Sequence, residues 1–207
     1  MPKFEIIDQS VEFKGKAFEV HRLNLRLPDG RSHHFELVKH RDSVSIMPID
    51  AERNLLFVSQ HRVGAGRDLL ELPAGVLEAG EDPQLGAGRE VREETGMAAR
   101  KLLQIGQAYL APGYTSELMY FFLADDLYPA PLAQDADEFI ELVKIPIAEA
   151  YRMARDGEIH DSKTLAALLL AEKYISKSPN PGSKRWIITT SNGRAPLKCD
   201  NNQPHSG

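Results

Sequence analysis

Apolar and polar residues alternate along much of the first third of the chain, which is the pattern of β-strands that bury one face. The predicted strands cover residues 4–13, 17–27, 35–38, 43–49 and 55–60. The second and third form a hairpin around the turn Pro28-Asp29-Gly30, and a change of phase near His21 predicts a bulge in it. The fourth and fifth are predicted to pair with each other around the turn at residues 50–54.

A helical pattern follows, bounded by residues that favour the ends of helices. Asp82 can accept a hydrogen bond at the N-cap, and Pro83 suits the first helical position, where the backbone N–H has no partner. Gly96 suits the left-handed conformation that ends many helices. Together these residues predict a helix over 83–95.

The remainder of the chain alternates between strand and helix patterns and ends in a polar tail. Strands are predicted at 102–110, 118–124 and 139–145, with a loop rich in proline and acidic residues at 125–137. Helices are predicted at 147–155 and about 162–176. In the last helix Asp161 is the expected N-cap, and Leu165, Leu168 and Leu169 are the expected buried stripe. From residue 177 onward there is little periodicity, which is typical of a mobile tail.

Length and charge narrow the classes of function. A chain of 207 residues suits one domain with a sizeable core. Its net charge of −5 argues against an extended nucleic-acid surface, so an anionic substrate must be met by metal and a few placed arginines. The single Cys199 excludes an internal disulfide framework, and no apolar run reaches membrane length. With no basic-then-apolar leader, a soluble, cytoplasmic protein is expected.

Three glutamates of the predicted 83–95 helix, Glu90, Glu93 and Glu94, are spaced so that they share one face. Like charges at this spacing repel by about 0.2–0.5 kcal/mol per pair on an exposed helix, and a solvated acidic face is one interpretation. The surroundings favour another, because a predicted strand at 69–72 and a glycine-containing loop precede the helix. Carboxylates gathered on a rigid element suit Mg²⁺ or Mn²⁺, which also bind phosphate oxygens.

From residue 75 to residue 97 the chain reads GVLEAGEDPQLGAGREVREETGM, which resembles the Nudix box at every defined position. The resemblance implies a Nudix hydrolase, a metal-dependent enzyme that cleaves the diphosphate of a nucleoside diphosphate linked to another group. Gly86 and Gly88 stand where relatives usually carry alanine. Each costs about 1 kcal/mol against alanine, which indicates a less stable helix or closer packing there.

The same resemblance implies a domain organisation and a set of metal ligands. An α/β fold is expected, a Nudix-type α/β/α sandwich with mixed sheets over residues 43–176. Residues 1–42 would be an added N-terminal β unit, and residues 177–207 a polar tail. Mg²⁺, with Mn²⁺ as a substitute, would be held by Glu90, Glu93, Glu94 and the carbonyl of Ala74.

Segments outside the box resemble the ADP-ribose pyrophosphatase branch of the family. They are Pro112, sixteen residues after Gly96, and the segments Gln60-His61-Arg62, Leu70 to Gly75, and Gly157 to Asp161. In that branch the extra N-terminal strands exchange between subunits, which implies a homodimer. ADP-ribose is the leading substrate, although GDP-mannose and other nucleotide-sugar hydrolases share these features. A nucleotide-sugar sensor without activity would lack box carboxylates, and the N-terminal extension argues against a nucleoside triphosphate hydrolase.

The expected contacts to substrate and the catalytic groups complete this hypothesis. The substrate-binding candidates are Arg62, Glu71, Pro112 and Glu117. Arg62 supplies a guanidinium for phosphate or carboxylate. Arg89 is expected to orient Glu93, although an i,i+4 surface pair is the alternative.

A general base must also take the proton of the attacking water. Metal-bound carboxylates accept protons poorly, which favours a base on a separate segment. The acidic loop at 132–141 fits, and Glu138 is chosen over Glu141 because Glu141 would already lie in the strand. The alternatives are a solvated acidic loop and a base within the box, with Glu93 the first candidate.

Overall fold

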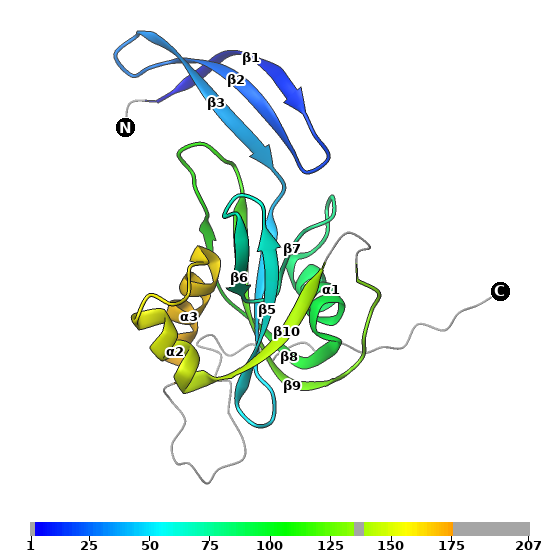
Figure 1. Cartoon of the computed structure of the whole chain (residues 1–207). Coiled ribbons are helices and arrows are strands. Elements are labelled where there is room, and N and C mark those ends of the chain that lie inside the picture. Colours follow the sequence, from blue (N-terminus) through cyan, green and yellow to red (C-terminus); the bar gives the residue numbers. More distant parts are fainter. Residues whose placement is uncertain (1–2, 135–138, 176–207) are drawn as a thin grey trace, which may run out of the picture.

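The computed structural model describes residues 3–134 and 139–175. A three-stranded sheet at the N-terminus stands apart from the remaining elements, which form two further sheets between helices (Figure 1). The order of strands and helices along the chain is that of an α/β protein with mixed sheets. The predicted fold class is therefore confirmed.

The N-terminal sheet is a simple antiparallel meander in the order β1-β2-β3. Its strands are β1 (Glu5–Lys14), β2 (Phe18–Arg26) and β3 (Ser32–His40). The pairing of β2 with β3 is continuous, so the bulge predicted in this hairpin is wrong. The pairing of β1 with β2 is irregular instead, with register shifts between Ile6 and Asp8 and between Val11 and Phe13, the second next to His21. The phase of the apolar residues changes because Phe18 and Val20 lie on one face of the continuous β2 and Leu23 and Leu25 on the other.

Seven strands form the two central sheets, ordered β7-β4-β9-β8 and β10-β5-β6. They are β4 (Ser43–Pro48), β5 (Asn54–Arg62), β6 (Arg67–Glu71), β7 (Ala74–Val76), β8 (Met97–Tyr109), β9 (Leu118–Pro129) and β10 (Ile140–Pro146). The pairing of β4 with β9 is parallel and the others are antiparallel, as in a mixed sheet.

Two predictions about these strands are wrong. β4 and β5 do not pair along their length; a single bridge from Ile49 to Leu55 joins them, and they then diverge into different sheets. Every residue of β4 is buried, which suits a central strand that is covered on both faces. Its hydrogen-bonded neighbours are accordingly β7 and β9. The predicted loop at 125–137 begins as strand, because β9 continues to Pro129 in its pairing with β8.

The helices are α1 (Pro83–Thr95), α2 (Ile147–Arg155) and α3 (Ser162–Ile175), which confirms the three predicted helices. The Asp82 carboxylate accepts the N–H of Gln84, and Gly96 ends α1 with a φ of 71°. Figure 1 shows α1 on one side of the central sheets and α2 with α3 on the other. This gives the layers of an α/β/α sandwich.

The buried stripe predicted for α3 is wrong at two of its three leucines. Leu168 is buried, but Leu165 and Leu169 are 37% and 72% exposed. The buried face of α3 consists of Lys163, Thr164, Ala167, Leu168 and Ala171. The helix turns a polar first turn inward because Thr164 Oγ1 accepts the buried N–H of Leu72 at 2.8 Å.

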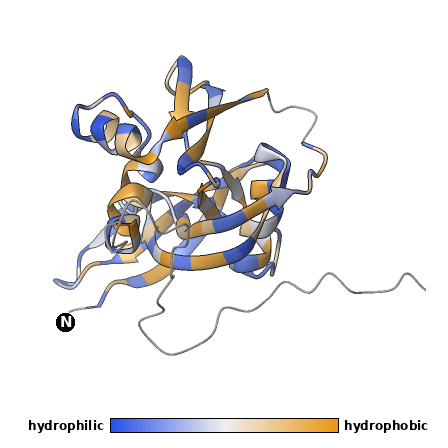
Figure 2. Cartoon of the chain, turned by 90° about the horizontal axis from the view of Figure 1, so that it is seen from below, coloured by the Kyte–Doolittle hydropathy of each residue, from blue (hydrophilic) through white to orange (hydrophobic). Residues whose placement is uncertain are grey.

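Alternation along the strands divides the core in two. On β9, Phe121 packs with the cluster beneath α2 and α3, whereas its neighbour Phe122 packs with the cluster beneath α1. Figure 2 shows the resulting bands of hydrophobic and hydrophilic residues along the strands. Within residues 3–134 and 139–175, no helix combines the length and the apolar content that crossing a membrane would require.

Candidate active site

Helix α1 brings its glutamates against the strand that precedes it. Glu90 and Glu94 are buried, with 8% and 5% of their surfaces exposed, and Glu93 is half-buried. Their spacing places them on the face of α1 that contacts β7 and β4. The acidic face is therefore packed against the protein, and the alternative of a solvated acidic face does not hold for Glu90 and Glu94.

Arg89 holds three carboxylates of the box together. Its Nη1 donates to Glu90 Oε1 at 2.6 Å and to Glu93 Oε2 at 2.9 Å, so the predicted contact to Glu93 is present. Nε and Nη2 donate to Glu81 at 3.1 and 3.0 Å. The hydrogen bonds to Glu81 raise the pKa of Arg89 and, reciprocally, lower the pKa of the Glu81 carboxyl. One guanidinium thus holds Glu81, Glu90 and Glu93 by hydrogen bonds and favours the ionised form of Glu81.

The backbone of β7 lies directly against the buried carboxylates. A Cβ on Gly75 would fall 2.0 Å from the carboxyl group of Glu90, so only glycine fits there. The N–H of the preceding residue, Ala74, donates to Glu94 Oε2 at 3.1 Å. The structure therefore brings Ala74, Glu90 and Glu94 together, as the predicted ligand set requires, with Glu93 joined to them through Arg89.

The donor set fits a divalent cation in its chemistry. Carboxylate and carbonyl oxygens are the ligands that Mg²⁺ and Mn²⁺ prefer. Among the described residues, however, no three acidic, histidine or cysteine side chains converge on one metal position. Arg89 engages Glu90 and Glu93, and Glu94 bonds to a backbone amide.

Arg62, at the end of β5, is held by a buried carboxylate of β6. Its Nε and Nη2 donate to Glu71 at 2.8 and 2.7 Å, and these hydrogen bonds raise the pKa of Arg62. Burial disfavours the ionised form of Glu71, but Arg62 and Lys163 outweigh it and lower the pKa of that carboxyl. The charge of Arg62 also interacts with that of Glu94. Glu71 thus fixes the Arg62 guanidinium at the end of β5.

Lys163 is a residue that the sequence reasoning missed. It lies on the buried face of α3 and contacts both Glu71 and Asp161. The sequence did contain a signal for Lys163. It lies two residues after Asp161, the last residue of a segment that resembles the ADP-ribose pyrophosphatase branch.

Glu117 and Pro112 lie near the junction of the N-terminal sheet with the central sheets. Glu117 Oε1 accepts the hydroxyl of Ser43 at 2.6 Å and lies 3.8 Å from His40 Nδ1. Ser43 pairs with Val76 of β7, so Glu117 is at the same end of the sheet as the glycine loop. Pro112 is exposed in the turn after β8.

The predicted base, Glu138, lies outside the described residues. Its alternative, Glu141, is exposed on β10 and pairs in register with Ser59 of β5.

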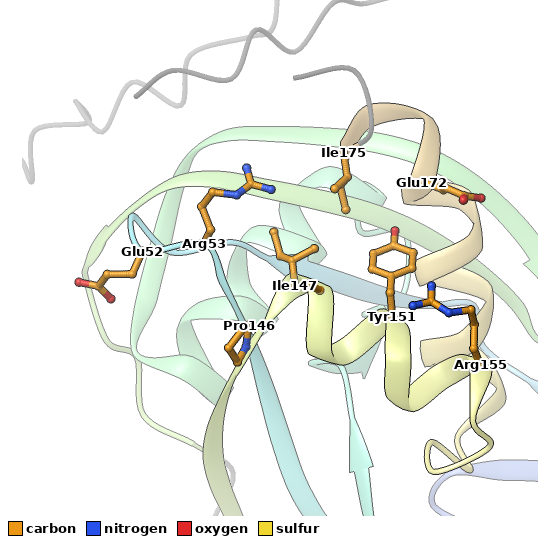
Figure 3. Close-up of a pocket in the computed structure, with 9 residues that line it drawn as sticks. Glu52, Arg53, Pro146, Ile147, Tyr151, Arg155, Glu172 and Ile175 are labelled. Carbon is orange, nitrogen blue, oxygen red and sulfur yellow. The ribbon is translucent and has the colours of Figure 1, made fainter. Parts of the chain in front are cut away.

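A pocket of about 600 Å³ lies elsewhere, between α2, the end of α3 and the turn after β4 (Figure 3). It is lined by Glu52, Arg53, Pro146, Ile147, Ala148, Tyr151, Arg155, Glu172 and Ile175. None of the box residues takes part in it. This pocket is therefore separate from the box residues.

Several proteins with curated names match most of this chain. The chain is 35% identical to the ADP-ribose pyrophosphatase of Bacillus subtilis (strain 168) over 158 residues, 75% of this chain and 85% of that protein. It is 35% identical to an ADP-ribose pyrophosphatase of Mycobacterium tuberculosis over 189 residues, 89% and 91% of the two chains. A GDP-mannose pyrophosphatase of Yersinia pestis is 34% identical over 146 residues, 69% and 71% of the two.

A solved structure and a domain family complete the comparison. The crystal structure of an ADP compounds hydrolase superposes with a TM-score of 0.76 at 27% identity, covering 84% of this chain and 95% of that one. The Nudix domain family matches residues 39–187, which include the whole box. The chain therefore belongs to the Nudix family.

Proposed function

We propose that the protein hydrolyses the diphosphate bond of a nucleoside diphosphate sugar, with ADP-ribose as the leading substrate and AMP and ribose 5-phosphate as products. The observation that carries the proposal is the intact cluster of Glu90, Glu93 and Glu94, two of which Arg89 holds by hydrogen bonds. The relatives named ADP-ribose pyrophosphatase and the ADP compounds hydrolase support the choice of substrate.

The box supplies the metal site in this proposal. Glu90, Glu93, Glu94 and the Ala74 carbonyl would hold Mg²⁺ or Mn²⁺, which would supply positive charge to the diphosphate and polarise its phosphorus. Arg89 orients Glu90 and Glu93, since its Nη1 reaches both carboxylates. Arg89 and the box glutamates thus hold several carboxylate oxygens in a fixed arrangement beside β7.

Other residues bind the substrate and move the proton. Arg62 contacts phosphate with the guanidinium edge that Glu71 does not use, and Glu71 acts by fixing that guanidinium. Pro112 and Glu117, at the glycine-loop end of the sheet, contact the nucleoside or the sugar. Glu138 accepts the proton of the attacking water, as predicted for a base on a separate segment.

GDP-mannose is the second candidate substrate, because a relative of similar identity is named GDP-mannose pyrophosphatase. A non-catalytic sensor of nucleotide sugars is disfavoured, since every carboxylate of the box is in place. Hydrolysis of free nucleoside triphosphates is disfavoured by the names of the relatives that cover most of this chain.

We also propose a cytoplasmic homodimer that assembles through the N-terminal unit, residues 1–42. Apolar side chains of its sheet face solvent in the single chain: Phe4, Ile6, Val11, Phe13 and Phe18 are 41–62% exposed. Exposed apolar side chains of this kind are typical of protein interfaces. Residues 43–176 form the catalytic domain in this organisation, and residues 177–207 lie outside the described part of the chain.

A panel of substrates tests the function. ADP-ribose, GDP-mannose, UDP-glucose and nucleoside triphosphates are each incubated with Mg²⁺, and the products are separated by chromatography. We expect turnover of ADP-ribose to exceed that of the triphosphates, and we expect a chelator to abolish it and added Mg²⁺ or Mn²⁺ to restore it. Preference for a triphosphate, or activity that survives chelation, would refute the proposal.

A further inference from the structure

The first turn of α3 carries a buried lysine that the proposed chemistry does not use. Only 8% of the surface of Lys163 is exposed. Lysine is rarely buried without partners, because burial penalises the ammonium charge. Its Nζ donates to Glu71 Oε2 and lies 3.0 Å from Asp161 Oδ1, so two carboxylates compensate the charge.

These side chains form a neutral cluster with Arg62. Glu71 and Asp161 carry the negative charges, and Lys163 and Arg62 the positive ones. The Glu71 carboxylate lies between the guanidinium and the ammonium and is 1% exposed. Asp161 is in turn held by the N–H and hydroxyl of Thr164, at 3.0 and 2.6 Å. The ammonium therefore links the Arg62–Glu71 pair to a well-anchored turn of α3.

Arg62 is the member of this cluster that can reach a substrate. Its side chain is 41% exposed, and with Nε and Nη2 bonded to Glu71 the third nitrogen, Nη1, remains outside that pair. A planar guanidinium recognises phosphate through directed hydrogen bonds, so its orientation affects binding.

We infer that Lys163 is a positioning residue for substrate binding: it holds Glu71 from α3, and thereby orients Arg62 toward the substrate diphosphate and keeps the cluster neutral. The inference rests on the proposed function and extends it to a residue outside the box. Without the ammonium, Glu71 would retain one cationic partner and the cluster would become negative. Both changes oppose binding of a diphosphate. The rate of the hydrolytic step, which depends on the box glutamates, would change little.

Lys163→Met tests the inference, since it removes the charge and keeps an unbranched side chain. We expect KM for ADP-ribose to rise about tenfold and kcat to change by less than about threefold. A purely structural role would reduce the folded fraction and the apparent kcat but leave KM unchanged. Lys163→Arg, which keeps the charge, should restore KM to within about threefold of wild type.

The matched control is Lys144→Met. It removes an ion pair with Asp50, 3.3 Å long, at the opposite end of β5 from Arg62. We expect no change in KM. A tenfold rise in this control, or an unchanged KM in Lys163→Met, would overturn the inference.

A double variant shows whether Lys163 acts through Arg62. In an Arg62→Ala background, Lys163→Met should raise KM by no more than about twofold further, because the group that it orients is gone. An additional tenfold rise would contradict a positioning role.

Calorimetric titration of ADP-ribose with Mg²⁺ separates this inference from the proposed function. If wild type binds ADP-ribose but does not hydrolyse it, the proposed function fails, and a Kd raised about tenfold in Lys163→Met would still support the positioning role. If wild type hydrolyses ADP-ribose and Lys163→Met leaves both KM and Kd unchanged, only the positioning role fails. No binding to wild type would overturn both.

Discussion

The acidic face of α1 offers carboxylates to a binding partner, whereas the N-terminal sheet offers apolar side chains. On α1, Glu90 and Glu94 are buried, and Arg89 links Glu90, Glu93 and Glu81. On the sheet, apolar side chains such as Ile6 and Phe13 remain more than half exposed.

Burial of a charge and exposure of an apolar surface both cost free energy, and different ligands offset the two costs. A cluster of carboxylates is relieved by a cation, whereas an apolar face is relieved by another protein surface. The kind of group that each region gathers, rather than its burial alone, therefore indicates what that region binds.

The largest expected effect comes from removing a charge on the acidic face. Glu93→Gln and Glu94→Gln should each lower kcat by about 10³-fold or more, because each removes an anionic ligand from the proposed metal site. Initial rates with saturating Mg²⁺ and ADP-ribose measure this, and circular dichroism verifies the fold. Glu149→Gln, on the exposed part of α2, is the matched control and should keep full activity. Turnover near that of wild type in either box variant would remove the box from the mechanism.

The next effect separates the base from the metal ligands. Glu138→Gln should lower kcat by about 10²–10⁴-fold with little change in KM, the usual range for loss of a general base. Glu141→Gln, one step into β10, is its comparison. A silent Glu138→Gln with an inactive Glu141→Gln would move the base within the same segment. If both variants are silent, the base lies in the box and Glu93 is tested first.

A substitution in the N-terminal sheet should change the oligomeric state of the protein rather than its catalytic rate. Phe13→Lys replaces an exposed apolar side chain of this sheet with a charge, and we expect the variant to be a single chain of 23.1 kDa in light scattering where wild type is a dimer. Leu169→Lys is the control, because Leu169 is equally apolar and 72% exposed but lies on α3. A wild-type monomer at micromolar concentration would contradict the dimer. Deletion of residues 1–40 without any change in assembly would contradict the role of the sheet.

Much of the fold could be predicted from residues with strong local preferences. Asp82, Pro83 and Gly96 set the ends of α1, because their side chains or backbone freedom act within one turn. The place of β4 could not be predicted in this way. The turn after it resembles that of a hairpin, but its partner β9 lies far along the chain and pairs with it in parallel.

The same limit applies to the site. Contacts within one helix, such as Arg89 with Glu93, follow from i,i+4 spacing. Lys163 was missed because its partner Glu71 is 92 residues away, and a lysine on a helix is normally solvated. Leu165 and Leu169 were misplaced for a related reason: hydrophobicity alone favoured them, whereas the hydrogen bond of Thr164 to Leu72 determines which face of α3 turns inward.

The smallest expected effect concerns two glycines of α1 that occupy different environments. A Cβ on Gly88 would meet nothing within 4 Å, so Gly88→Ala should stabilise the protein by about 0.5–1 kcal/mol through helix propensity and a less disordered unfolded chain. A Cβ on Gly86 would lie 2.3 Å from Leu77 Cδ2, and Leu77 is 5% exposed in the core beneath α1. Overpacking there costs about 1–3 kcal/mol and should outweigh the same gain, so Gly86→Ala should lower stability. Urea unfolding of both variants measures the difference, and a Gly86→Ala protein as stable as Gly88→Ala would show that close packing does not account for Gly86.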